Sequence, residues 1–291
     1  MRRPLSFPGR SGRSAVRRRG SSLGGRLLIA IILVLFSLGA YYFGTQEVYN
    51  PVTEETQRVS LTVDQEIQLG LQAAPQMARQ FGGLHPNSQW QSVVDEVGQH
   101  LVANSVAADT PYRFEFHVLA DEQTVNAFAL PGGQIFITAA LLQALETEGQ
   151  LAGVLAHEIG HVVGRHAAEQ MAKARLMEGL AGAAGVVLTD PENPDSAQAA
   201  QLAAVVAQLV NMRHSREDEL ESDRLGVRIM ADAGYDPRAL IRVMEILAEA
   251  SGGRGGPEFF STHPNPDNRI AQIEAAIARE FPNGLPADLT P

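Results

Sequence analysis

Residues Ala152 to His166 read AGVLAHEIGHVVGRH, and the interpretation of the whole chain starts from this stretch. Its apolar residues recur at helical spacing, so it predicts a buried helix. His157 and His161 are four residues apart and share one helix face, where their ring nitrogens can occupy two corners of a zinc tetrahedron. Glu158 lies about 100° further round the helix, where it can reach a water on the metal without binding the metal itself.

A chance occurrence is the competing interpretation of this pattern. With eight histidines in the chain, an HExxH pattern should arise by chance on the order of once in a hundred such sequences. The setting favours a metal site, because three ionisable side chains interrupt an apolar run, where burial without a metal or partners would be costly. We therefore interpret His157 and His161 as metal ligands and Glu158 as the catalytic base.

A third ligand must come from elsewhere, since a catalytic zinc site has three protein ligands and leaves one position for water. The chain has no cysteine, so histidine or carboxylate must supply it. A histidine at position 167 would complete the pattern HExxHxxGxxH, but that residue is alanine, and His166 is one position early. We interpret His166 as a surface residue or as a partner of a metal ligand.

The segment from Ser215 to Gly226, SREDELESDRLG, offers carboxylates for the same purpose. Its acidic side chains include Glu217, Glu219, Glu221 and Asp223. Glu219 and Asp223 share a helix face at i, i+4, so one can bind the metal while the other orients a zinc-bound histidine. A solvent-exposed acidic helix would show the same spacing. Spacing alone leaves this choice open.

The charge of the chain is unevenly distributed. Residues 1 to 26 contain eight arginines and no acidic residue, which leaves 15 basic and 33 acidic residues in the remainder. A body this acidic would be repelled by nucleic acid, whose non-specific binding depends on lysine and arginine contacts to phosphate. With 45% hydrophobic and 19% charged residues, the composition is that of an ordinary globular protein. A nucleic-acid partner is therefore not expected.

An apolar segment follows the basic region. Residues 27 to 43, LLIAIILVLFSLGAYYF, carry no charge and have the length of a short membrane span. Arginines before it and Tyr41 and Tyr42 at its end predict a cytoplasmic N-terminus and a catalytic body on the far side of the membrane. A cleaved signal peptide is the alternative, but no small-x-small cleavage site follows the apolar core. We expect a single uncleaved anchor.

The remainder predicts an α+β fold that is mainly α-helical, with a small antiparallel β-sheet. Amphipathic spacing indicates helices at 63–81 and 88–104, alternation indicates strands at 112–119, 126–130 and 134–138, and helices follow from residue 148 onward. The Ala-rich runs at 176–188 and 197–210 are too short and too weakly apolar to span a membrane. The expected organisation is a basic tail at 1–26, an anchor at 27–43, a linker at 44–61 and a folded domain at 62–291.

Taken together, these residues resemble the zinc metallopeptidases of peptidase family M48, over a range from about Ser60 to Phe281. Three separated motifs carry the resemblance: HEIGH at 157–161, ELESD at 219–223 and STHPNPDNRI at 261–270. The run NAFALPGGQIFIT at 126–138 is also similar to the edge strand beside the family's active site. The chain departs from some members in having a single N-terminal span and no helical-repeat domain.

This resemblance implies a zincin fold of the gluzincin type, with Glu219 as the third zinc ligand and Asp223 as its partner. It also implies substrate-facing roles for His263 and Arg269, with His263 able to approach the zinc or an oxyanion. Substrate would lie along an edge strand formed by Asn126, Ala127, Phe128 and Ala129, where main-chain hydrogen bonds give little sequence preference.

The expected function is that of a zinc metalloendopeptidase with one Zn²⁺ per chain, in which Glu158 passes the water proton to the leaving amine. Unfolded or misfolded proteins of the cell envelope are the expected substrates. The alternative is a membrane-tethered chaperone or adaptor whose zinc is structural or latent, which would be favoured if His263 closed the site as a fourth ligand.

Overall fold

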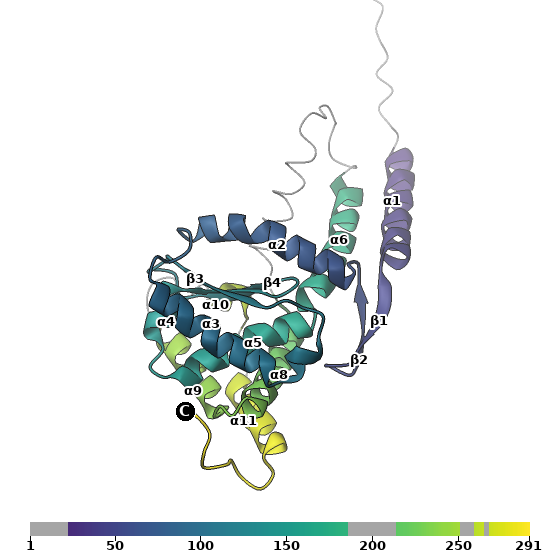
Figure 1. The fold of residues 1–291 in the computed structure, drawn as a ribbon. Coiled ribbons are helices and arrows are strands. Elements are labelled where there is room, and N and C mark those ends of the chain that lie inside the picture. The colour runs from purple at the N-terminus through teal and green to yellow at the C-terminus, as the bar shows by residue number, and fades with distance from the viewer. Residues whose placement is uncertain (1–22, 186–213, 251–258, 265–267) are drawn as a thin grey trace, which may run out of the picture.

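The computed structural model describes residues 23–185, 214–250, 259–264 and 268–291 (Figure 1). The second Ala-rich run, at 197–210, and nearly all of the basic tail lie outside the described residues. Within them, the chain forms a mainly helical domain with two small sheets. This is the α+β class that the sequence predicts.

Helix α1 (Leu23–Gly44) projects from this domain with helix α6 (His166–Gly185) packed beside it (Figure 1). The segment predicted as an anchor, 27–43, falls inside α1. Within the part of the chain that the structure describes, no helix combines the length and the apolar character needed to cross a membrane.

A β-hairpin occupies the segment predicted as a linker. Strands β1 (Gln46–Asn50) and β2 (Glu55–Val59) pair antiparallel, with Asn50 opposite Glu55. The buried amides of Asn50 and Gln57 donate hydrogen bonds to the carbonyls of Val163 and Gly164, at the end of helix α5 (Glu148–Val163). These two bonds satisfy carbonyls that have no partner within a helix, so the hairpin also caps the helix that carries the HEIGH motif.

The three-stranded sheet is mixed, whereas the sequence predicted an antiparallel one. Its order is β3 (Glu115–Leu119), β5 (Gln134–Thr138) and β4 (Ala127–Leu130), with β5 parallel to β3 and antiparallel to β4. The chain leaves β3, forms β4 at the outer edge and returns through a tight turn into the centre. Gly132 and Gly133 have φ angles of 84° and 108°, which glycine adopts without strain, so this turn can place β5 between the other two strands.

Alternate residues of the sheet face two different layers. Phe128, Leu130 and Phe136 pack against α2 (Val63–Gln80) on one side. Phe116, Val118, Ile135 and Ile137 form the larger core on the other side, together with α3 (Ser88–Ala103) and α5. Figure 1 shows the sheet between these helices, and the period-two alternation of the strands produces both layers. The bounds of α2 and α3 confirm the predicted helices at 63–81 and 88–104 within one residue.

Six further elements complete the described part of the domain. They are η1 (Val106–Asp109), α4 (Ala139–Ala144), α8 (Arg216–Asp232), α9 (Arg238–Ala250), α10 (Phe259–Thr262) and α11 (Arg269–Glu280). Helix α8 packs most extensively against α5. A Cβ atom on Gly160 would lie 2.7 Å from Ser222 Oγ and 2.9 Å from its carbonyl oxygen, so only glycine permits this approach. The contact brings the acidic residues of α8 against the two histidines of α5.

We predict that Gly160→Ala destabilises the protein by about 2 kcal/mol, because the added methyl group must displace the backbone of α8. Gly226→Ala is the matched control on the facing helix. Its Cβ would meet His157 at 3.4 Å, an ordinary contact, so alanine should leave stability unchanged or raise it by up to about 1 kcal/mol. Urea unfolding of the two variants measures the difference, and equal stabilities would contradict the role of the close contact.

Candidate metal centre

Three donor groups converge between α5 and α8. His157 Nε2 and His161 Nε2 lie 3.1 Å apart, and the carboxylate oxygens of Glu219 lie 3.5 and 3.4 Å from them respectively. All three side chains are buried. Tetrahedral zinc with bonds of about 2.1 Å separates its ligand atoms by roughly 3.4 Å, so these distances suit one zinc ion. Of the two possible sources of a third ligand, the structure places the carboxylate, Glu219, at the histidine pair.

The fit to a cation is supported by buried polar atoms that lack a hydrogen-bond partner. Both carboxylate oxygens of Glu158 and the Nε2 atom of His263 are buried and make no hydrogen bond. Leaving buried polar groups unpaired costs on the order of 1 to 3 kcal/mol each. A water and a cation between the donors would satisfy these groups, which is the arrangement that histidine and carboxylate ligands provide for zinc.

Asp223 lies one helical turn beyond Glu219 and faces the first histidine. His157 Nδ1 donates to Asp223 Oδ1 at 2.9 Å, which leaves Nε2 directed at the donor cluster. A carboxylate commonly fixes the tautomer of a metal-binding histidine in this way, and the orienting role that the resemblance implies for Asp223 stays a prediction.

His263 and Arg269 also reach the centre, but they face different groups. His263 Nδ1 lies 3.0 Å from Glu219 Oε1, and its Nε2 lies 3.6 Å from Glu158 Oε1. Arg269 donates two hydrogen bonds to Asp223 at 2.7 and 2.9 Å and lies 3.2 Å from Glu219. Arg269 is 2% exposed, so its guanidinium is occupied by carboxylates. The substrate-facing role that the resemblance implies for Arg269 stays a prediction.

Two further histidines complete the cluster. His214 stacks on His161 with ring centroids 3.9 Å apart, and the sequence analysis did not single it out. It stands just before the acidic segment, outside any ligand spacing, so only the folded chain identifies it. His166, for which the sequence left a surface position open, is 1% exposed and lies 2.8 Å from His161.

The electrostatic environment shifts the pKa values of the two histidine ligands in opposite directions. Burial disfavours protonation of His157, but hydrogen bonds to Asp223 and Glu219 outweigh it and raise its pKa to about 9. Burial and the neighbouring His214 lower the pKa of His161 well below its ordinary value. The pKa of Glu219 is likewise held well below its usual range, because nearby His263 and the hydrogen bonds from His157 and His161 outweigh its burial. Glu219 is therefore a carboxylate, and His161 is neutral.

The pKa of Glu158 is shifted in the opposite direction to that of Glu219. It is fully buried, and burial raises the pKa of its carboxyl despite the nearby His263. A carboxylate that holds its proton more readily is suited to accept one from water near neutral pH. Its place on α5 beside His157 agrees with the position inferred from the helix spacing.

The predicted substrate strand lies at the outer edge of the mixed sheet. Ala127 to Leu130 form β4, which pairs only with β5 among the described strands, and β4 also packs against α5. Asn126 precedes it and is tied through its backbone to Thr138, while its buried Oδ1 has no hydrogen-bond partner. The outer edge of β4 therefore presents main-chain groups beside the helix that carries the metal donors.

We predict that His161→Ala abolishes stoichiometric zinc binding, because it removes one of the three donors whose mutual distances suit the ion. Elemental analysis of purified protein should show about one zinc per wild-type chain and close to none in the variant. His85→Ala is the control, since His85 stacks on Trp90 away from the cluster. Full zinc in a folded His161→Ala protein would mean that the ligand set is wrong.

Comparisons with known proteins agree with this geometry. The family model described as peptidase family M48 matches residues 88–277. The chain is 32% identical over 216 residues to the beta-barrel assembly-enhancing protease of Yersinia pestis, and 31% identical over 219 residues to that of Escherichia coli (strain K12). Each match covers 73% of this chain and 44% of the relative, so the chain spans less than half the length of these two proteins.

A third relative is matched over more of its length. The mitochondrial metalloendopeptidase OMA1 of Schizosaccharomyces pombe is 31% identical over 242 residues, which is 81% of this chain and 68% of that protein. The family match includes the HEIGH helix, the acidic helix α8 and most of α11, and these elements supply the metal donors and Arg269. The chain belongs to peptidase family M48.

Proposed function

We propose that this protein is a zinc metalloendopeptidase. The observation that carries the proposal is Glu158, a buried carboxylate with no hydrogen-bond partner beside a set of three zinc donors. A site built only to hold zinc needs no such group. Membership of the M48 family and the names of the relatives, a protease and a metalloendopeptidase, support the same activity.

The residues of the chain divide the reaction between them. A zinc ion held by His157, His161 and Glu219 would supply a Lewis acid that polarises the scissile carbonyl and acidifies the attacking water. Glu158 takes the proton of that water and returns it to the leaving amine. His263 lies next to Glu158, with Nδ1 donating to Glu219, and in its imidazolium form it would donate to the oxyanion through Nε2, which has no other hydrogen bond. Arg269 holds Asp223 and Glu219 in place.

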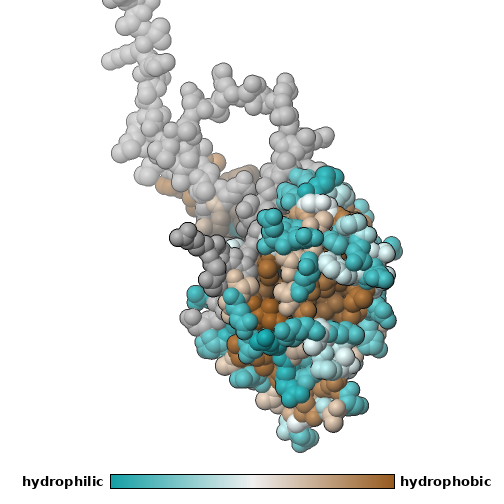
Figure 2. Space-filling view, turned by 90° about the vertical axis from the view of Figure 1, so that its left-hand side faces the viewer, coloured by the Kyte–Doolittle hydropathy of each residue, from teal (hydrophilic) through white to brown (hydrophobic). Residues whose placement is uncertain are grey.

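Extended segments of unfolded or misfolded proteins are the substrates we propose. An extended peptide would add to the outer edge of β4, where main-chain hydrogen bonds bind with little regard to sequence. Figure 2 shows a face on which apolar residues gather at the centre between hydrophilic ones, the kind of surface that binds unfolded polypeptide. Quality control of envelope proteins would be the physiological role; the bacterial relatives are named for enhancing beta-barrel assembly.

We predict that Glu158→Gln retains about one zinc per chain and loses cleavage of an unfolded model protein by at least about 100-fold, because general base catalysis is removed. Gel analysis of the cleavage products and elemental analysis of the same sample measure both properties. Wild-type cleavage by the variant would overturn the proposed role of Glu158.

A second candidate is a chaperone or adaptor with a structural or latent zinc. The observation in its favour is His263, which lies within 4.8 Å of the other donors and could close the site as a fourth ligand. The same experiment separates the two functions. A zinc-loaded wild-type chain that prevents aggregation of an unfolded protein without cutting it would support the second candidate.

We also propose that α1 tethers the domain to a membrane, with the arginine-rich N-terminus on the cytoplasmic side. Large apolar side chains of α1 are exposed, among them Leu35, Phe36 and Phe43. The helix projects away from the domain (Figure 1), and eight arginines precede it. Charge on one flank and aromatic residues on the other are the features that orient a single span.

We predict that the whole chain stays in the membrane fraction after alkaline carbonate extraction, whereas a chain without residues 1–43 is released, because the deletion removes the apolar segment. Immunoblotting of the two fractions measures the difference. Release of the whole chain would contradict the proposed tether and leave the metal centre unaffected.

A further inference from the structure

The two histidine ligands meet the donor cluster in the same way. Each directs Nε2 inward, 3.1 Å from the other, and Nδ1 outward. For His157 the outward nitrogen is held by Asp223. For His161 the outward nitrogen lies 2.8 Å from Nδ1 of His166. The second ligand is therefore held by a histidine where the first is held by a carboxylate.

His166 is in turn held by a carboxylate of α8. Its Nε2 lies 2.8 Å from Oε2 of Glu221, and the imidazole is 1% exposed. The tautomers follow from this chain of contacts. If Nε2 of His161 faces a metal, its Nδ1 carries the proton and donates to Nδ1 of His166. His166 must then carry its own proton on Nε2, and it donates that proton to Glu221.

The backbone around His166 fits this arrangement. Helix α5 ends at Val163, Arg165 has a φ of 57°, and α6 starts at His166. The turn folds the imidazole back onto α5. A Cβ on Gly164 would lie 2.6 Å from His166 Nε2, so a larger residue there would displace the ring. The left-handed Arg165 is fixed by hydrogen bonds from its guanidinium to Glu66 and to the carbonyl of Leu61.

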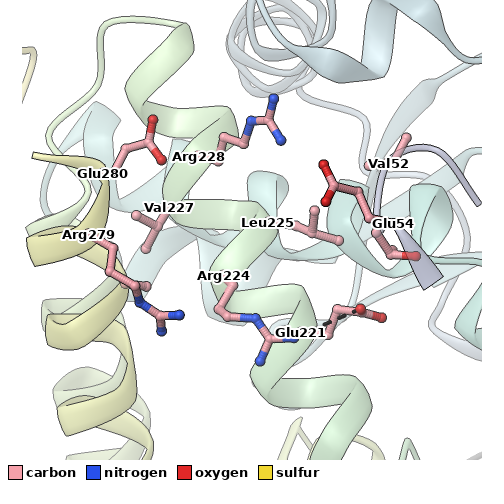
Figure 3. Close-up of a pocket in the computed structure, with 11 residues that line it drawn as sticks. Val52, Glu54, Glu221, Arg224, Leu225, Val227, Arg228, Arg279 and Glu280 are labelled. Carbon is pink, nitrogen blue, oxygen red and sulfur yellow. Dashed lines mark ion pairs between the residues drawn. The ribbon is translucent and has the colours of Figure 1, made fainter.

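Glu221 links the buried cluster to the surface. It lines a pocket of about 400 Å³ between α8, α11 and the β1–β2 turn, with Arg224 beside it at 3.9 Å (Figure 3). Its side chain is 14% exposed, so the carboxylate is solvated on one side and bound to His166 on the other. Helix α8 thus supplies Glu219 to the metal donors, Asp223 to His157 and Glu221 to His166.

We propose that His166 and Glu221 are positioning residues that orient His161 and raise the affinity of the site for zinc. The inference rests on the proposed metal centre and concerns how its second histidine is held. Groups that hold a metal-binding histidine through its outer nitrogen typically change metal affinity by 10- to 100-fold when they are lost.

The test is the zinc dissociation constant, measured by competition with a chromophoric chelator. His166→Phe keeps a ring of similar size and removes the acceptor, so its dissociation constant should rise about 10- to 100-fold. His166→Asn returns an acceptor near the position of Nδ1 and should recover most of the loss. Glu221→Gln should give a smaller rise, of about 3- to 10-fold, because it weakens the outer bond only. Glu280→Gln, in the same pocket, is the control and should bind zinc as the wild type does.

The outcomes separate this inference from the metal centre on which it rests. Zinc retained by His161→Ala would overturn the centre itself. Zinc lost by His161→Ala but bound with wild-type affinity by His166→Asn, His166→Phe and Glu221→Gln would overturn only the positioning role. Two zinc ions per wild-type chain would also overturn it, because a second ion would then use the Nδ1 atoms of His161 and His166. If His166→Phe does not fold, Glu221→Gln decides the matter: a weaker zinc affinity supports the positioning role, and wild-type affinity overturns it.

Discussion

The contact between Gly160 and Ser222 sets the distance between α5 and α8, and the site depends on that distance. Two histidines on one helix can offer a metal only two corners of a tetrahedron. The third comes from α8, and the close crossing lets the carboxylate of Glu219 lie within 3.5 Å of both rings. The hydroxyl of Ser222 also donates to the carbonyl of His157, which joins the two helices at the ligand itself.

Charge is balanced around this crossing by an arrangement that a metal would complete. Glu158, Glu219 and Asp223 are buried together, and Arg269 is the only arginine that the structure shows in contact with them. Buried carboxylates are costly unless they are paired, so a divalent cation bound to the folded state would stabilise it in proportion to its affinity. Holding each histidine in one tautomer also favours binding of the cation, because a ligand that is already oriented loses less conformational freedom on binding.

Much of the site follows from local spacing, and the rest requires tertiary contacts. The i, i+4 spacing of His157 and His161 predicted one shared helix face, and the i, i+4 spacing of Glu219 and Asp223 predicted another. That spacing left open whether the acidic face met the metal or the solvent, and family resemblance supplied the answer. The strands were predicted in place, but β5 lies between β3 and β4 through its parallel pairing with β3, and alternation cannot reveal strand order. His214 and the buried state of His166 depend on elements distant in sequence.

The hairpin within the segment predicted as a linker limits how far α1 and the domain can move apart. Helix α1 ends at Gly44 and β1 begins at Gln46, and Arg58 of β2 donates to Thr45 between them, so there is little slack at this junction. At the other end of the hairpin, Asn50 and Gln57 donate hydrogen bonds to the carbonyls at the C-terminal end of α5. If α1 lies in a membrane, as we propose, this short and rigid connection would hold the metal centre close to the bilayer. The proposed activity would then be limited to polypeptides that come close to the membrane surface.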